Sequence, residues 1–423
     1  MNLEEEIHSL GQRAKTASRI LAQADTDQKN SALLAMADAV LNHSDAILSA
    51  NALDLSAATE NGLSSAMLDR LRLDPARLQK IAEGIRSVAA LSDPVGALIS
   101  DWTRPNGLHI SKVRVPIGVI GIIYESRPNV TSDAAILCLK TGNATLLRGG
   151  SEAIHSNLAL AEALQTGLKI AGLPADSILL VPKTDRDGVR IMAQMNQYLD
   201  VIIPRGGKGL IEAVVENARM PVIKHYEGIC HVFVDSNVNY IMASEIVING
   251  KCQRPGVCNA VETVLIHQAI SHVFLPILAT ELEKYQVEIR ADPQSYSQLA
   301  TLHYRPLHAA SEQDFRTEHL ALILNIKIVA SLEEAIEHIE SYGSRHSDTI
   351  VTNSEAKAEK FLNEIDSATV FWNASTRFND GGEFGFGAEI GISTDKLHAR
   401  GPMGLEELTT YKYQIRGSGQ IRP

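Results

Sequence analysis

The sequence is poor in cysteine and has no long apolar run, and each shortage excludes a class of protein. Four cysteines in 423 residues are too few for a disulfide framework, and they lack the paired spacing of a structural metal site. No apolar run approaches the roughly 18 residues that a membrane span needs, and the acidic N-terminus lacks the features of a signal peptide. We therefore expect a cytoplasmic protein with reduced thiols, no metal and no membrane partner.

Basic and aromatic residues are also scarce. Lys and Arg total 39 against 50 Asp and Glu, the net charge is −11, and 5% of the residues are aromatic. A nucleic-acid partner is not expected, because such proteins carry basic faces with aromatic residues among the lysines and arginines. Small anionic substrates stay possible, since an acidic protein can contain local cationic pockets. The length suggests two or three domains of about 150 residues each.

Regular secondary structure is predicted over most of the chain. Residues 2–93 have helical spacing, residues 95–114 alternate around an Asn-Gly pair as a β-hairpin does, and residues 115–124 form an apolar run typical of a buried parallel strand. Strands and helices then alternate up to about residue 248 and again after it, which predicts two doubly wound α/β domains. Residues 407–417 predict a strand that pairs with the hairpin, and the glycine-rich residues 379–404 predict an irregular loop that lines a cleft.

Cys258 is the residue whose position most needs an explanation. It follows Pro255 and Gly256 in the connection between a predicted helix and an apolar strand. Backbone amides can converge on a thiol in such a turn, and nearby positive charge favours the nucleophilic thiolate. The alternative is a small buried apolar side chain, which is the commoner role of a cysteine. Cys138, on a predicted apolar helix face, and Cys252 are assigned to that structural role.

Basic residues recur in the turns that follow the predicted strands of the first α/β domain, where such sheets bind ligands. Amides at glycine-rich helix starts bind phosphate, and basic side chains add charged hydrogen bonds. The residues that suit a nucleotide phosphate are Arg148, Lys183, Arg205 and Lys208. Because the chain contains neither GxGxxG nor GxxxxGK[ST], tight glycine turns with solvated basic side chains are an equal alternative.

The chain resembles the aldehyde dehydrogenase superfamily in five segments that occur in order. The segments are YESRPNVT, IPRGGKGLI, HYEGICHVFVD, QRPGVCNAVET, and EFGFGAEIGIST with HARGPMGLEELTTYKY. The resemblance covers residues 2–417 and is closest to the branch that reduces γ-glutamyl phosphate. It implies a cofactor-binding domain (residues 1–94 and 115–248), a catalytic domain (249–375), an oligomerisation flap (95–114 and 405–423) and a glycine-rich cleft loop (376–404).

The resemblance also implies roles for individual residues. Cys258 matches the nucleophile, Asn129 the side-chain donor of the oxyanion hole, and Glu318 the glutamate that holds the nicotinamide ribose. The positions that match the dinucleotide-binding turns are Gly206 and Gly207, together with Arg148, Gly149, Gly150 and Ser151 at the adenosine ribose. An arginine with glycines at that ribose would tolerate a 2′-phosphate, which favours NADPH over NADH.

The expected substrate carries a phosphate, an α-carboxylate and an α-ammonium, so its site should offer cations and a carboxylate. Arg127, Arg254 and Arg377 are candidates, with structural ion pairs as the alternative. His225 stands where hydrolytic members of the superfamily have the glutamate that activates water. A substrate role for this histidine competes with a structural one.

The activity implied is NADPH-dependent reduction of L-γ-glutamyl 5-phosphate to L-glutamate 5-semialdehyde through a cysteine thioester, in proline biosynthesis. In the reverse direction this is a phosphorylating, NADP-dependent dehydrogenase activity on the semialdehyde. Expected protein partners are further copies of the chain and a glutamate 5-kinase that supplies the labile acyl phosphate. The alternatives are a non-phosphorylating NAD(P)-dependent aldehyde dehydrogenase, a cysteine hydrolase, for which no local His signature is present, and a catalytically silent scaffold.

Overall fold

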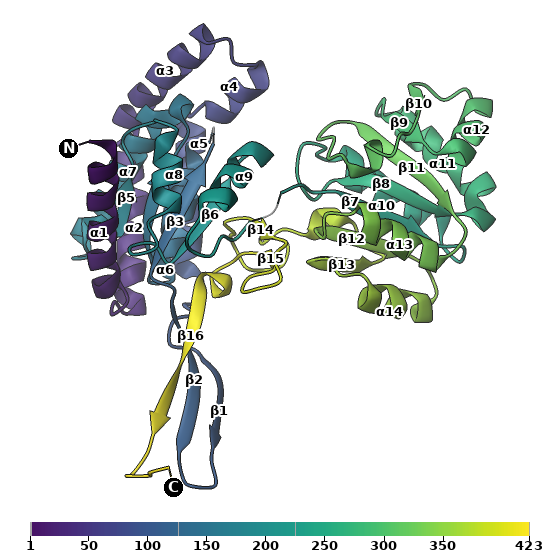
Figure 1. Cartoon of the computed structure of the whole chain (residues 1–423). Helices are drawn as coiled ribbons and strands as arrows, with labels where there is room; N and C mark the ends of the chain where they lie inside the picture. The colour runs from purple at the N-terminus through teal and green to yellow at the C-terminus, as the bar shows by residue number, and fades with distance from the viewer. Residues whose placement is uncertain (1, 126, 225, 423) are drawn as a thin grey trace. The chain divides into compact units, whose positions relative to one another are not determined.

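The computed structural model describes residues 2–125, 127–224 and 226–422, which form two compact units (Figure 1). Unit 1 contains the described residues up to Lys224, Gly385–Gly391 and those from Met403 onward. Unit 2 contains the described residues after Lys224 up to Phe384, together with Ile392–Pro402. Each unit is built on its own parallel sheet. Among the described residues, no helix has both the length and the apolar composition required to cross a bilayer.

Unit 1 begins with a layer of helices, as the helical spacing predicts. They are α1 (Leu3–Leu21), α2 (Thr26–Asn42), α3 (Ser44–Glu60), α4 (Ser65–Leu71) and α5 (Pro75–Ala90). Asn2 and Glu5 form a reciprocal capping box at the start of α1. Asp74 caps α5, which starts with Pro75 as its first residue. These two helices therefore begin where side chains satisfy backbone amides that have no partner inside the helix.

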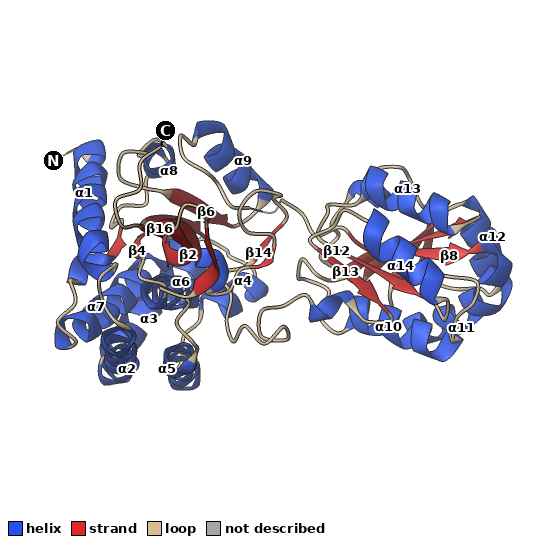
Figure 2. Ribbon diagram, turned by 90° about the horizontal axis from the view of Figure 1, so that it is seen from below, coloured by secondary structure: helices blue, strands red, loops and turns tan. Residues whose placement is uncertain are grey.

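The sheet of unit 1 is parallel, with the strand order β5-β4-β3-β6. Its elements are β3 (Val119–Tyr124), α6 (Asn129–Lys140), β4 (Ala144–Arg148), η1 (Ser151–Ala153), α7 (Ile154–Ile170), η2 (Ala175–Ser177), β5 (Ile178–Leu180), α8 (Asp187–Ala193), β6 (Val201–Arg205) and α9 (Lys208–Asn217). All of β3 is buried, because α1, α8 and α9 cover one face of the sheet and α6 and α7 the other (Figure 2). The strand order reverses between β3 and β6, and such reversal points bind ligands at the carboxyl ends of the strands.

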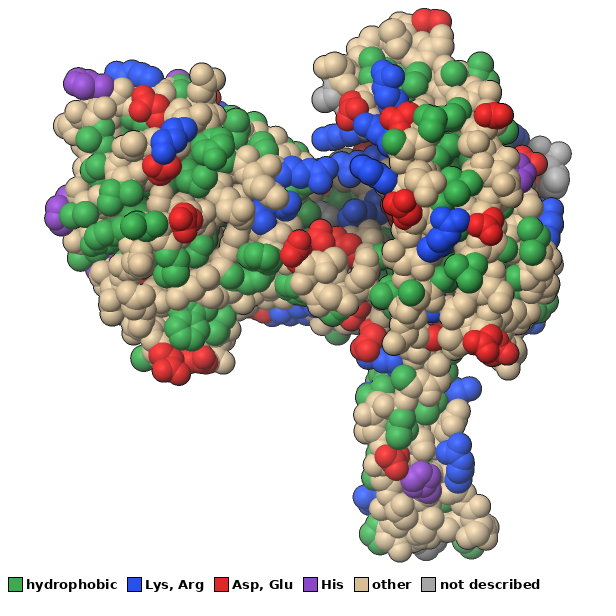
Figure 3. All heavy atoms as spheres, turned by 180° about the vertical axis from the view of Figure 1, so that it is seen from behind, with side chains coloured by type: hydrophobic (Ala, Val, Ile, Leu, Met, Phe, Trp, Pro, Cys, Tyr) green, Lys and Arg blue, Asp and Glu red, His purple; other side chains and the backbone are tan. Residues whose placement is uncertain are grey.

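A three-stranded antiparallel sheet, which we call the flap, extends from unit 1. It consists of β1 (Leu98–Thr103), β2 (His109–Pro116) and β16 (Thr409–Arg416), which follows η6 (Glu406–Leu408). The predicted hairpin and the predicted pairing of the C-terminal strand with it are confirmed. Gly107 in the hairpin turn has a φ of 84°, which glycine adopts at little cost. Figure 3 shows apolar side chains among charged ones on one face of the flap.

Unit 2 contains a seven-stranded parallel sheet with the order β10-β9-β11-β8-β7-β12-β13. Its elements are β7 (Cys230–Val234), α10 (Tyr240–Cys252), β8 (Val261–His267), η3 (Gln268–Ile270), α11 (Ser271–Glu283), β9 (Glu288–Ala291), α12 (Pro293–Thr301), β10 (Leu307–Ala309), η4 (Asp314–Arg316), β11 (Ile323–Val329), α13 (Leu332–Tyr342), β12 (Ser347–Val351), α14 (Glu355–Glu364) and β13 (Thr369–Trp372). Helices α10 and α11 pack on one face, and α13 and α14 on the other (Figure 2). The predicted α/β class is confirmed.

Two boundaries differ from the prediction. The second unit begins after Lys224 rather than at residue 249, because β7 pairs with β8 and β12 of the second sheet. Residues 376–404 are not wholly irregular, because η5 (Thr376–Phe378) opens them and β14 (Ile392–Ser393) pairs with β15 (Gly401–Pro402). Part of this segment, Gly385–Gly391, belongs to unit 1. Both differences arise from pairing between distant residues, which a local pattern does not contain.

Candidate active site

Cys258 lies in unit 2, in the turn that joins α10 to β8, and it is half-buried. Gly228 packs directly on this turn. A Cβ atom on Gly228 would lie 1.8 Å from the carbonyl oxygen of Cys258, so a larger residue would displace the turn. The thiol of Cys230 donates to the same carbonyl at 3.2 Å, and burial raises the pKa of Cys230 well above its ordinary value, which keeps it a protonated donor. Residues 228–230 therefore fix the backbone that carries Cys258.

Arg377 and Arg254, both predicted substrate cations, belong to the same region of unit 2. The pKa of Arg377 is lowered first by burial and then by the positive charge of Arg254, while the charge of Cys258 acts in the opposite direction. Both residues are therefore within electrostatic range of Arg377. Its guanidinium is held in place, because Nε donates to Gln253 at 2.8 Å and Nη1 donates to the side-chain oxygen of Asn259. Two arginines thus place positive charge near Cys258, which favours a thiolate.

Glu318 also lies beside this turn. Burial raises the pKa of its carboxyl group, and a hydrogen bond from the backbone amide of Gly228 opposes that shift. Gly228 therefore contacts both Cys258 and Glu318, two residues that are far apart in the sequence. The structure brings together the predicted nucleophile and the predicted ribose-binding glutamate.

A buried ion pair supports the loop after Glu318. Nζ of Lys251 lies 2.8 Å from Oε2 of Glu262, and both side chains are fully buried. The same ammonium group donates to the carbonyl of Ala321 at 3.2 Å, while Oε1 of Glu262 accepts from the amide of Leu320 at 3.4 Å. Burial raises the pKa of Glu262 to about 7, against the opposing charge of Lys251. The pair ties α10 and β8, which flank Cys258, to this loop.

Asn129 is the first residue of α6 in unit 1. Its Nδ2 donates to Oδ2 of Asp133, one helical turn later, at 2.8 Å. Burial raises the pKa of Asp133 to about 6, and the hydrogen bonds from Asn129 and Ser132 and the charge of Arg205 oppose the rise. An asparagine amide carries two N–H bonds. Asp133 therefore orients the amide through one of them and leaves the other for a ligand.

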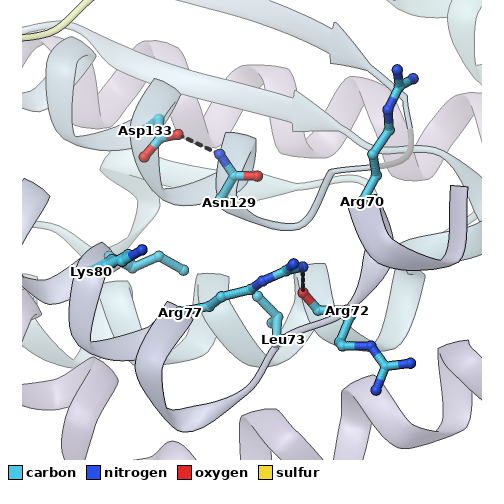
Figure 4. Close-up of a pocket in the computed structure, with 8 residues that line it drawn as sticks. Arg70, Arg72, Leu73, Arg77, Lys80, Asn129 and Asp133 are labelled. Carbon is cyan, nitrogen blue, oxygen red and sulfur yellow. Dashed lines mark hydrogen bonds between the residues drawn. The ribbon is translucent and has the colours of Figure 1, made fainter. Parts of the chain in front are cut away.

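Asn129 and Asp133 line a cavity of about 310 Å³ in unit 1 (Figure 4). Four basic residues line the same cavity: Arg70, Arg72, Arg77 and Lys80, from α4, α5 and the connection between them. In Figure 4 the asparagine and the aspartate face Arg77 and Lys80 across the open space. The cavity thus combines a side-chain amide, a carboxylate and several cations.

The turn after β6 carries four of the predicted cofactor-binding residues. The amide of Gly207 donates to Oε2 of Glu125 at 2.9 Å, and a Cβ atom on Gly206 would lie 2.6 Å from the same oxygen. The carboxylate of Glu125 therefore occupies the N-terminus of α9, where an anion is stabilised. Arg205 is half-buried and Lys208 is exposed beside it.

The two basic residues predicted after β4 and β5 are engaged within unit 1. Arg148 is buried, and its Nη2 donates to the carbonyls of Thr184 and Asp185 at 2.9 and 3.3 Å. Lys183 forms an ion pair with Glu6 of α1 at 2.7 Å. Arg148 is therefore held inside unit 1, whereas Lys183 stays exposed in its ion pair, as the structural alternative expects.

The two glycines after Arg148 differ in how closely their surroundings pack. A Cβ atom on Gly149 would lie 2.1 Å from Nδ2 of Asn157, and one on Gly150 would lie 2.4 Å from Oε1 of Glu152. Ser151 is exposed at the start of η1. Close packing thus accounts for Gly149, as the structural alternative expects, while the atoms near Gly150 belong to the flexible end of the Glu152 side chain.

The remaining substrate candidates are Arg127 and His225. Arg127 is exposed in the loop between β3 and α6, and it belongs to unit 1. His225 lies outside the described residues. The cluster of cations around Cys258 within unit 2 therefore contains two of the three predicted arginines.

A sequence profile of the aldehyde dehydrogenase family matches residues 2–299. The chain belongs to the aldehyde dehydrogenase family. The γ-glutamyl phosphate reductase of Moorella thermoacetica is 56% identical over 422 residues, which cover 100% of both chains. The reductase of the same name from Caldanaerobacter subterraneus is 54% identical over 99% of this chain and 100% of its own. The crystal structure of γ-glutamyl phosphate reductase from Thermotoga maritima has a TM-score of 0.96 and 45% identity, covering 99% of this chain and 100% of that chain.

As a member of the aldehyde dehydrogenase family the chain is an oxidoreductase, and the family uses nicotinamide cofactors. The residues after β4 fit such a group in one respect. Nε of Arg148 is buried without a hydrogen-bond partner among the described residues, and a buried N–H group of this kind is costly unless a ligand accepts from it. A phosphate oxygen would be a suitable acceptor.

Sequence reasoning missed several residues around Cys258 in unit 2 and around Asn129 in unit 1. Some left a signal in the sequence: Glu262 interrupts an otherwise apolar strand, and Asp133 follows Asn129 at the helical spacing of four. The basic residues at the cavity left none, because their positions between two short helices look like an ordinary solvated surface. Gly228 was quoted in a motif, yet nothing local indicates that it touches Cys258.

Proposed function

We propose that the chain reduces L-γ-glutamyl 5-phosphate to L-glutamate 5-semialdehyde and phosphate with NADPH, as a step of proline biosynthesis. The names of its relatives support this reaction. The observation that carries the proposal is the setting of Cys258, which is half-buried on a turn fixed by Gly228 and Cys230 and within electrostatic range of Arg377. A rigidly held thiol in a cationic environment suits acyl transfer.

In the first half of the reaction the thiolate of Cys258 attacks the acyl carbon. The new C–S bond forms as the C–O bond to phosphate breaks, and phosphate leaves with the electron pair. The second N–H of the Asn129 amide donates to the oxyanion that develops on the acyl oxygen. Arg377 and Arg254 lower the free energy of the leaving phosphate through their positive charge.

In the second half the thioester on Cys258 is reduced. A bound NADPH supplies the hydride. The Asn129 amide again holds the negative oxygen of the resulting thiohemiacetal, and the C–S bond then breaks to release the aldehyde and regenerate the thiolate of Cys258. Glu318, which the Gly228 amide orients, would hold the nicotinamide ribose, and Arg148, Lys183, Arg205 and Lys208 with the adjoining glycines would hold the phosphates.

The test is oxidation of L-glutamate 5-semialdehyde by NADP⁺, followed at 340 nm with and without inorganic phosphate. We expect NADPH to form only when phosphate is present, and the Cys258→Ala variant to form none. The same assay with NAD⁺ measures the preference for the 2′-phosphate. We expect a higher kcat/KM with NADP⁺, because the buried Nε–H of Arg148 has no acceptor among the residues that the structure describes.

A second candidate is non-phosphorylating oxidation of an aldehyde. Glu318 interacts electrostatically with Glu227, and it accepts from Gly228 beside Cys258. A carboxylate there could activate water to hydrolyse a thioester. Equal rates with and without phosphate would favour this candidate and reject the first.

Self-association through the flap is part of the proposal. Every residue of β1 is exposed, including Leu98 and Trp102, and Tyr413 and Ile415 of β16 are 53% and 60% exposed. Apolar residues on a projecting sheet are stabilised when a second copy covers them. Trp102→Ser with Tyr413→Ser should lower the molar mass measured by light scattering. Cytoplasmic location and a partner glutamate 5-kinase stay predictions.

A further inference from the structure

The cavity beside Asn129 carries more positive charge than its neighbours balance. Arg70, Arg72 and Lys80 are exposed, and their side chains make no hydrogen bond or ion pair with another described residue. Arg77 is fixed instead, because its guanidinium donates to the carbonyl of Arg72 and to the carboxylate of Asp69, both at 2.7 Å. One anchored cation and three free ones therefore surround a single opening.

This arrangement runs against the charge of the chain as a whole. The chain carries a net charge of −11, yet among the residues that line the cavity four are basic and only Asp133 is acidic. Like charges that gather around one space repel each other, and a bound anion relieves that repulsion. The charges around the cavity therefore favour the binding of a ligand with a negatively charged group.

We propose that this cavity binds the amino-acid end of the substrate, with its cations around the α-carboxylate and Asp133 beside the α-ammonium group. The assignment rests on the proposed function and names the residues that recognise its substrate. Asn129 forms part of the wall, so a substrate whose acyl oxygen meets the Asn129 amide extends its other end into the cavity. A volume of about 310 Å³ accommodates a glutamyl chain.

The presence of both charges favours the amino-acid end over the phosphate. An α-amino acid presents a carboxylate and an ammonium group on one carbon, and the cavity offers cations and a carboxylate on facing walls (Figure 4). Asp133 accepts from Asn129 through Oδ2, and a carboxylate can accept several further hydrogen bonds. A phosphate would gain from the cations but would be repelled by Asp133.

The test compares two double variants that each lose one arginine and one lysine. The cavity variant is Arg70→Gln with Lys80→Gln, and the control is Arg19→Gln with Lys169→Gln. All four side chains are exposed, and none forms a hydrogen bond or ion pair with another described residue, so neither variant should change folding. Equal melting temperatures would verify this. KM is then measured for L-glutamate 5-semialdehyde, for phosphate and for NADP⁺ in the phosphate-dependent oxidation.

We expect the cavity variant to raise KM for the semialdehyde about 10-fold, as loss of a charged hydrogen bond does, with the other two KM values within about twofold of the control. Its selectivity for the semialdehyde over propanal, which lacks both charged groups, should fall by a similar factor. Values equal to the control for all three KM would overturn the inference. A rise confined to KM for phosphate would also overturn it, because the cavity would then hold the phosphate.

The outcome separates this inference from the proposed function. If the unaltered chain shows no phosphate-dependent oxidation, the proposed function is wrong and the inference fails with it. If the unaltered chain is active and the cavity variant matches the control, the function stands and only the assignment of the cavity is wrong.

Discussion

The charged residues near Cys258 in unit 2 and those at the cavity of unit 1 differ in burial. Around Cys258 the Lys251–Glu262 pair is fully buried, and Gly228 packs against the backbone of Cys258, the proposed nucleophile. At the cavity, Arg70 and Lys80 are exposed. A reacting atom must be held in one geometry, which buried contacts achieve. Groups that recognise a soluble, charged substrate can stay hydrated until it arrives, which avoids the desolvation cost of a buried charge.

The largest effect should follow the loss of the nucleophile itself. Cys258→Ala removes the atom proposed to form the thioester, so we expect phosphate-dependent NADPH formation to fall by a factor of at least about 10³. NADP⁺ affinity, measured by fluorescence titration, should be unchanged. Cys252→Ala, on the preceding helix, is the control and should keep most of the activity. Substantial activity in Cys258→Ala would mean that another residue is the nucleophile.

The buried pair should contribute strongly to stability. Lys251→Met leaves Glu262 buried without its partner, and we expect the free energy of unfolding in urea to fall by about 3–5 kcal/mol. Lys284→Met, which breaks an exposed pair with Glu281, is the matched control and should cost less than about 1 kcal/mol. Lys251→Met with Glu262→Leu should recover part of the loss. Equal effects of Lys251→Met and the control would show that the buried pair does not stabilise the folded state.

The oxyanion donor should affect turnover rather than binding. Asn129→Ala removes the hydrogen bond proposed for the transition state, worth about 3 kcal/mol, so kcat should fall about 100-fold. KM for NADP⁺ should stay within twofold. Asn363→Ala removes an amide that bonds to its own helix on the exposed surface, and it should leave kcat unchanged. A fall in stability without a fall in kcat would assign Asn129 a purely structural role.

Asp133 should make stability depend on pH. Burial raises its pKa from 3.8 to about 6, with Asn129, Ser132 and Arg205 opposing the rise. Because the folded state binds the proton more tightly, this contribution to stability is complete below about pH 4 and is lost as pH rises through 6. Asp133→Asn should remove that loss. The unfolding free energy at pH 8 minus the value at pH 4 should then be larger in the variant than in the unaltered chain, by up to about 3 kcal/mol.

Urea unfolding at each pH measures this dependence, and the exposed Asp45→Asn is the control. The cations of the cavity reduce the effect by favouring the charged carboxylate, so about 3 kcal/mol is an upper limit. Parallel pH profiles for Asp133→Asn and the unaltered chain would contradict the prediction.

The smallest effect is expected at the start of α9. Glu125→Gln removes a negative charge from the amide of Gly207, so a cofactor phosphate could approach this helix end more closely. We expect NADP⁺ to bind about threefold more tightly in a fluorescence titration. Glu212→Gln, exposed on the same helix, should have no effect. Weaker binding in Glu125→Gln would instead make this carboxylate a contributor to the cofactor site.

The two regions also differ in how far local patterns predicted them. In unit 1 the hairpin and the strand that joins it were predicted from alternation, and β3 from its apolar run, because these signals come from neighbouring residues. In unit 2 the position of β7 was missed, since a strand carries no local sign of the sheet that it joins. The short strands β14 and β15 were missed for the same reason.

The sequence by itself determined the family, the α/β class and most helices and strands, because these follow from motif order, periodicity and the residues next to each position. Only the tertiary structure decided that Gly228 supports Cys258, that Asp133 orients Asn129, and that basic residues from α4 and α5 surround the same cavity. Those relations depend on packing between segments far apart in the chain, and a side chain's partners and burial are set there rather than by its neighbours in the sequence.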